Sequence, residues 1–126
     1  MAAGVRKTKT GLRGNVPAAF PPRTLVVVWL ASPREKFWGM ILRISPVGVY
    51  LCGIDLSSFD GFVALLRGGA AAVPSEVFFP MHRVERIEAD QRNSDIPSLS
   101  ERFMAATGRS AESLMTTDQT RSVRQP

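Results

Sequence analysis

Hydrophobic residues in the first half of the chain fall into three short runs that are separated by turn signals. The runs cover residues 24–31, 36–44 and 49–56, and each is rich in β-branched or aromatic residues, which is typical of strands. Between the first two runs Pro33 fixes φ for a turn, and the stretch SPVG at 45–48 has the residue preferences of a type I turn. The pattern predicts an antiparallel meander of three strands with short connections.

The next segment changes from strand periodicity to helix periodicity. Four apolar residues recur at the spacing of one helical face: Phe59, Phe62, Val63 and Leu66. Ser57 and Asp60 have the spacing of a capping box, and two consecutive glycines at 68 and 69 end the pattern. The sequence therefore predicts a helix inserted between the third and the fourth strand.

Two further strands are predicted at 76–80 and 83–90, on either side of Met81 and His82. The apolar residues of the second segment do not alternate strictly with polar ones. A bend or a bulge is therefore expected within the fifth strand.

A second helix is predicted at 98–108, because Ser98 and Glu101 have capping-box spacing and Gly108 supplies a stop. The residues beyond it are polar and unpatterned. The expected organisation is one domain, divided into a disordered basic arm at 1–23, a small β-barrel at 24–97, a C-terminal helix at 98–108 and a disordered tail at 109–126.

The first strand is apolar on both faces. One face carries Leu25, Val27 and Trp29, and the other carries Val26, Val28 and Leu30. Such a strand is typically buried on both sides. One side would meet the core, and the other would be covered either by a predicted helix of the same chain or by another subunit in a homo-oligomer.

Composition and cysteine content restrict the class of protein. The chain has 126 residues, of which 44% are hydrophobic, and a single cysteine, so it has no internal disulfide framework. A reducing, cytoplasmic location is the simplest expectation. The longest apolar run, residues 25–31, is too short to cross a bilayer as a helix, and the N-terminus does not resemble a secretory signal, so no membrane association is expected.

The net charge of +5 lies in the N-terminal arm. Residues 1–23 contain no acid and five basic side chains, namely Arg6, Lys7, Lys9, Arg13 and Arg23, and the rest of the chain is balanced. Two interpretations stay open. The arm adds salt-sensitive affinity for nucleic acid, or it is a solvated tail that aids solubility.

His82 is the only histidine of the chain and lies at the predicted bend. As a metal ligand it lacks partners, and as a general base it lacks an adjacent nucleophile motif. Two interpretations remain: a contact to an RNA base, or a polar residue that the backbone satisfies at a strand bend.

Other candidate catalytic residues have structural interpretations. Cys52 alternates with apolar strand residues and is expected to be a small buried side chain. Asp55 and Asp60 flank the first helix start, where Asp60 is assigned to the capping box. The glycine-rich stretch after the helix lacks the Lys-Ser/Thr ending of a phosphate loop. We therefore expect no enzymatic activity, no cofactor and no metal site.

The strand pattern resembles the Sm-like RNA-binding family, which includes bacterial Hfq. The segment TLVVVWLASPREKFWGMILRI at 24–44, with Phe37 and Gly39, looks like the apolar strand, turn and long bent second strand of that family. VFFPMHRVERI at 77–87 looks like its second motif, where two strands meet through a one-turn 3₁₀ step next to a histidine. The resemblance implies a mainly β fold, a small five-stranded SH3-like barrel. The family's Asp and Asn pair in the turn after the second strand is replaced by SPVG.

The leading functional hypothesis is a non-enzymatic module that binds RNA or single-stranded nucleic acid. Its expected contacts are Arg34 and Lys36 in the first turn, His82 and Arg83 at the bend, and the basic arm at Arg6, Lys7, Lys9 and Arg13. The alternative is a protein-interaction or structural module that docks a partner through its apolar strand or an appended helix.

Overall fold

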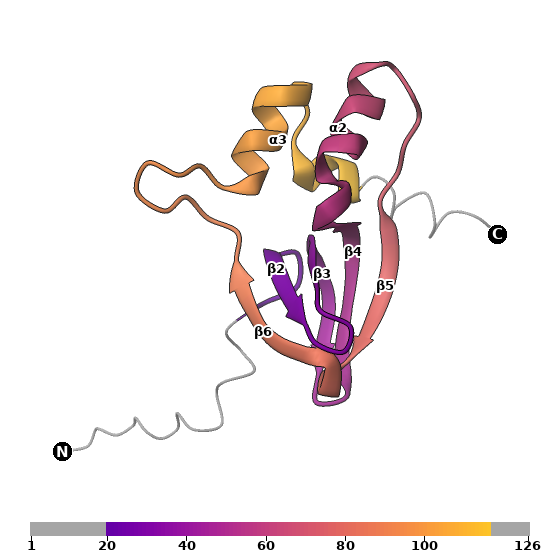
Figure 1. The fold of residues 1–126 in the computed structure, drawn as a ribbon, viewed down its shortest axis with the longest axis vertical. Coiled ribbons are helices and arrows are strands. Elements are labelled where there is room, and N and C mark those ends of the chain that lie inside the picture. Colours follow the sequence, from indigo (N-terminus) through magenta and orange to yellow (C-terminus); the bar gives the residue numbers. More distant parts are fainter. Residues whose placement is uncertain (1–19, 117–126) are drawn as a thin grey trace.

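The computed structural model describes residues 20–116 of the chain (Figure 1). Strands and helices follow the predicted order. The elements are β2 (Leu25–Leu30), β3 (Glu35–Ser45), β4 (Gly48–Asp55), the 3₁₀ turn η2 (Leu56–Ser58), α2 (Phe59–Arg67), β5 (Ser75–Pro80), the 3₁₀ turn η3 (Met81–Arg83), β6 (Val84–Ala89) and α3 (Leu99–Thr107).

The five strands form one antiparallel sheet in the order β5-β4-β3-β2-β6. A mainly β fold with an inserted and a C-terminal helix is therefore confirmed. The sheet is not closed into a barrel, because β5 pairs with β4 alone and β6 with β2 alone among the described strands. The short turn η3 joins these two outer strands where they converge (Figure 1), and they do not pair with each other beyond it.

Backbone irregularities bend the sheet. Gly39 and Gly53 face each other across β3 and β4, and a Cβ added at Gly53 would lie 2.1 Å from the carbonyl oxygen of Trp38. The close approach of the two backbones therefore requires glycine. The bulge expected in the fifth strand, β6, is confirmed. Trp29 and Leu30 are consecutive on β2, but their partners on β6 are Arg86 and Val84, so β6 has one extra residue at this point.

Apolar residues form two clusters, one on each face of the sheet. The cluster under the helices contains Leu25, Trp38, Met40, Cys52, Ile54, Phe59, Val63, Phe103, Ala111, Leu114 and Met115. The other contains Val26, Val28, Leu30, Phe37, Ile41, Val49 and Leu51, and side chains from both outer strands close over it. Val26, Val28 and Leu30 are fully buried on one face of β2, whereas on the other face Leu25 is buried and Val27 and Trp29 are half-buried.

The two helices begin differently. In α3 the expected capping box is confirmed, since the Ser98 hydroxyl accepts from the Glu101 amide and the Glu101 carboxylate accepts from the Ser98 amide. The capping box expected at Ser57 and Asp60 is wrong. The chain turns one step earlier, in η2, and Asp55 caps that turn by accepting from the Ser57 amide.

The predicted disordered ends also need correction where the structure describes them. Phe20 packs against the second apolar cluster, and the Arg23 amide donates to the Ile41 carbonyl at 2.7 Å, so order begins before residue 24. Residues 111–116 are helical rather than a disordered tail. Ala111, Leu114 and Met115 are buried there because they complete the apolar cluster under the helices.

No helix within residues 20–116 combines the length and the hydrophobicity needed to cross a bilayer.

Candidate functional site

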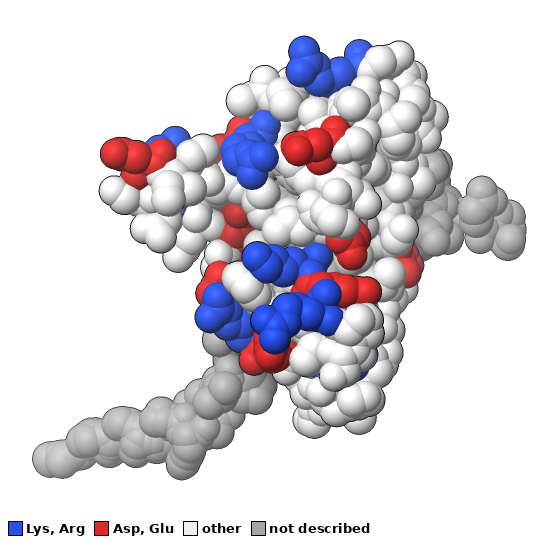
Figure 2. All heavy atoms as spheres, viewed as in Figure 1, with Lys and Arg blue, Asp and Glu red and all other residues white. Residues whose placement is uncertain are grey.

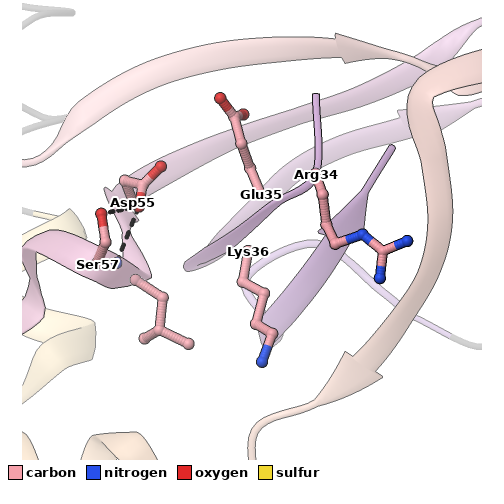
Figure 3. Close-up of a pocket in the computed structure, with 6 residues that line it drawn as sticks. Arg34, Glu35, Lys36, Asp55 and Ser57 are labelled. Atoms are coloured by element: carbon pink, nitrogen blue, oxygen red, sulfur yellow. Dashed lines mark hydrogen bonds between the residues drawn. The ribbon is translucent and has the colours of Figure 1, made fainter. Parts of the chain in front are cut away.

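An open hollow of about 430 Å³ lies where β3 begins and β4 ends. It is lined by Arg34, Glu35, Lys36, Asp55, Leu56 and Ser57. Figure 3 shows that Arg34 and Lys36 extend to one side of the strand while Glu35 points to the other. The structure therefore brings together two of the residues that the sequence analysis assigned to ligand binding.

The opposite wall of the hollow is polar and held in place. The Ser57 amide and hydroxyl both donate to Asp55 Oδ1, at 2.8 and 2.6 Å. Figure 3 shows these two bonds as dashed lines. Asp55 thereby keeps a fixed orientation, and its other carboxylate oxygen makes no hydrogen bond to a described residue. The hollow thus offers two cations on one side and a hydrogen-bond acceptor on the other.

Arg83 has a structural task beside this site. Its Nε donates to the Ala31 carbonyl at 3.0 Å, its Nη2 donates to the Pro33 carbonyl at 2.7 Å, and the same nitrogen lies 3.5 Å from Glu35 Oε1. Arg83 therefore ties η3 to the turn that precedes Arg34. The guanidinium is occupied by the protein and does not line the hollow.

His82 is exposed on η3, and its ring makes no hydrogen bond or ion pair with any residue in the described part of the chain. The backbone contact that one interpretation expected for it is thus not found there. His82 also does not line the hollow. Arg6, Lys7, Lys9 and Arg13 lie outside the described residues.

Two residues near the hollow were missed by the sequence analysis. Trp29 pairs with Lys36 on β3 and with Arg86 on β6, so the three side chains form one cross-strand row, called the Trp29 row below. Lys36 Nζ and the Arg86 guanidinium carbon each lie 4.2 Å from the centroid of the Trp29 ring. No local signal identifies this row, because it depends on the pairing of three strands.

Acidic side chains are interleaved with the basic ones around β2 and β6, as Figure 2 shows for this face. Arg86 pairs with Glu88 at 3.1 Å, and Arg83 with Glu35. Arg34 and Lys36 are the exposed cations of the site that have no ion pair with a described residue. They are therefore the cations that an anionic ligand meets without displacing an acidic side chain of the described residues.

A second exposed surface lies along β4 and the outer strand β5. Phe78 is 51% exposed and Val47 in the adjoining turn is 72% exposed. The Tyr50 hydroxyl donates to Glu76 Oε1 at 2.7 Å across the two strands, and this bond to a carboxylate raises the pKa of Tyr50 above its ordinary value of 10.0. One edge of β5 is unpaired within residues 20–116.

The described residues contain no cluster of three His, Cys, Asp or Glu side chains that could hold a metal ion. Comparisons of the chain with protein-family models, with curated proteins and with solved structures find no match.

Proposed function

We propose that this protein is a non-enzymatic module that binds single-stranded nucleic acid, with RNA as the leading ligand, at the hollow between β3 and β4. The observation that carries the proposal is the pair Arg34 and Lys36, two exposed cations that line one hollow and have no acidic partner within residues 20–116. Cations placed in this way bind phosphate groups and release counterions. The free oxygen of Asp55 would accept a hydrogen bond from a base or a ribose hydroxyl.

The resemblance to the Sm-like family supports the same ligand class. The five antiparallel strands and the one-turn 3₁₀ step between the last two agree with what that resemblance implies. The contacts would differ from those expected from the sequence. His82 and Arg83 lie on the neighbouring turn, and Arg83 would act by holding the turn that carries Arg34.

The test is the affinity of the full chain for a fluorescein-labelled oligouridylate, measured by anisotropy at several salt concentrations. Arg34→Gln and Lys36→Gln each remove one cation from the hollow. Arg67→Gln, at the end of α2, removes the same charge away from the site and is the matched control. A fourth variant replaces Arg6, Lys7, Lys9 and Arg13 with Gln and tests the arm.

The hollow variants should bind more weakly than wild type, and each should lower the slope of log affinity against log salt by about 0.7 for one lost phosphate contact. Arg67→Gln should bind like wild type. Loss of binding in the arm variant alone would assign the affinity to the arm and refute a site at the hollow. No binding by wild type at low salt would refute the function.

A second candidate function is docking of a protein partner or of another copy of this chain on β5. It is supported by the exposed Phe78 and the unpaired edge of that strand, since an edge strand offers free backbone groups to a further strand. Light scattering of wild type and Phe78→Ser would test self-association. A monomer in both cases at high protein concentration would exclude self-association.

A further inference from the structure

The Trp29 row adjoins the hollow because Lys36 belongs to both. Its three side chains come from adjacent strands, which lie about 4.8 Å apart in a sheet, so the row crosses roughly 10 Å of surface. The row extends the cationic side of the hollow across β2 to β6.

The indole holds both cations close together. Lys36 Nζ and the Arg86 guanidinium each contact the Trp29 ring, so the two charges are separated by at most twice the 4.2 Å that joins each one to the ring centroid. Cation–π contacts restrain these long side chains without neutralising them. The Arg86 side chain is 56% exposed although it also pairs with Glu88. Two restrained, accessible charges at this spacing suit a ligand that carries regularly spaced anionic groups.

The ring itself is not presented as a stacking surface. Each of the two neighbouring strands contributes one cation that lies over the Trp29 ring. The Nε1 of Trp29 is buried without a hydrogen-bond partner among the described residues. Trp29 therefore acts by positioning Lys36 and Arg86. A planar base can stack on the guanidinium of Arg86, as unpaired bases do on arginine in RNA-binding proteins.

We propose that the Trp29 row is a second contact for the strand bound at the hollow, and that Arg86 binds a phosphate of the nucleotides beyond those in the hollow. This inference rests on the proposed function. The strands that carry Lys36 and Arg86 lie roughly 10 Å apart across β2. The site therefore requires a longer ligand than the hollow alone, and affinity rises with oligonucleotide length until the strand reaches Arg86.

The experiment compares oligouridylates of about three and about eight nucleotides, a range that covers small single-strand sites, using the full chain and anisotropy. Arg86→Gln removes the distal charge. Arg102→Gln is the matched control, because Arg102 also lies over an aromatic ring, Phe59 at 4.9 Å, but on α3. Trp29→Phe keeps an aromatic ring under the cations, whereas Trp29→Leu removes it.

Arg86→Gln should weaken binding of the long oligonucleotide about tenfold, lower its salt slope by about 0.7, and leave the short one unchanged. Arg34→Gln should weaken binding of both oligonucleotides, and Arg102→Gln should weaken binding of neither. Trp29→Phe should bind both oligonucleotides nearly as tightly as wild type does. Trp29→Leu should show the same loss of affinity for the long oligonucleotide as Arg86→Gln. If Arg86→Gln binds the long oligonucleotide like wild type while Arg34→Gln does not, the Trp29 row is refuted and the hollow stands. If wild type binds neither oligonucleotide, the proposed function fails together with this inference.

Discussion

The indole Nε1 of Trp38 donates a hydrogen bond of 3.0 Å to Oδ2 of Asp90. Trp38 lies in the middle of the sheet, whereas Asp90 follows β6 at the start of the loop that leads to α3. The same carboxylate accepts from the backbone amides of Leu99 and Ser100 at 2.8 and 2.9 Å, and from the Ser100 hydroxyl. Asp90 thus joins the buried face of the sheet to the first turn of α3, whose unpaired amides it satisfies.

Replacing Asp90 with Ala should lower the free energy of unfolding by about 2–3 kcal/mol, because charge-assisted hydrogen bonds are lost and buried donors are left without a partner. Urea unfolding of the full chain measures this loss. Asp95→Ala is the control, since that exposed acid makes no hydrogen bond to a described residue. Equal stability of the two variants would show that Asp90 does not anchor α3.

Glycines in the sheet and in α2 should respond oppositely to alanine. A Cβ at Gly53 would meet backbone atoms of Trp38 and Gly39 at 2.1 and 2.5 Å, so Gly53→Ala should cost about 3 kcal/mol or more. Gly61 in α2 has open space around an added Cβ, and Gly61→Ala should stabilise by about 0.5–1 kcal/mol through helix propensity. Thermal unfolding shows whether each variant is less or more stable than wild type. A stable Gly53→Ala protein would mean that β3 and β4 can separate.

Arg83 and His82 are neighbours in sequence with different tasks. Arg83→Lys keeps the charge but loses the forked donor that spans two carbonyls, so it should cost about 1–3 kcal/mol in unfolding free energy. His82→Ala removes an exposed ring and should change stability by less than about 0.5 kcal/mol. Chemical denaturation of both variants makes the comparison. A larger loss of unfolding free energy for His82→Ala than for Arg83→Lys would contradict the structural role assigned to Arg83.

Stability should depend on pH through Glu101. The Ser98 amide donates to its carboxylate, which, together with Arg92, lowers the pKa of Glu101 below its ordinary value of 4.5. A lowered folded pKa means that the stabilisation is present in full above 4.5 and is lost as the pH falls through the folded value. Glu101→Gln should therefore destabilise the protein at neutral pH, and the difference from wild type should shrink below pH 4.5.

The internal control for this prediction is the pH range well above 4.5, where the difference between the two unfolding free energies should be constant. A difference that persists unchanged down to acidic pH would show that the capping box at α3 does not depend on the ionised carboxylate.

Local sequence signals predicted the elements well because they act within a few residues. The β-branched runs, the turn at 45–48, the capping box at Ser98 and the stop at Gly108 were each found within a residue or two of their expected bounds. Where two local signals competed, the prediction was wrong. Ser57 and Asp60 matched a capping box, but Asp55 lies closer to the start of the 3₁₀ turn and caps it instead.

Both predicted chain ends were wrong in part, because a few apolar side chains near each end pack against an apolar face of the sheet. Residues 111–116 are half polar, and their three apolar side chains complete the cluster beneath the helices. Phe20 likewise packs against the other face of the sheet. Neither contact has a periodic signal long enough to be distinguished from a tail.

The sequence by itself determined the order and type of the five strands and of helices α2 and α3, the near-neutral charge of residues 24–126 and the candidate cations Arg34 and Lys36. Only the tertiary structure decided that the sheet stays open, that Arg83 is occupied by the turn beside it, and that Trp29 lies between Lys36 and Arg86. The physical reason is strand register. Because β2 pairs with both β3 and β6, it brings together side chains of two strands that are far apart in the sequence. No signal local to β3 or β6 specifies that these side chains become neighbours.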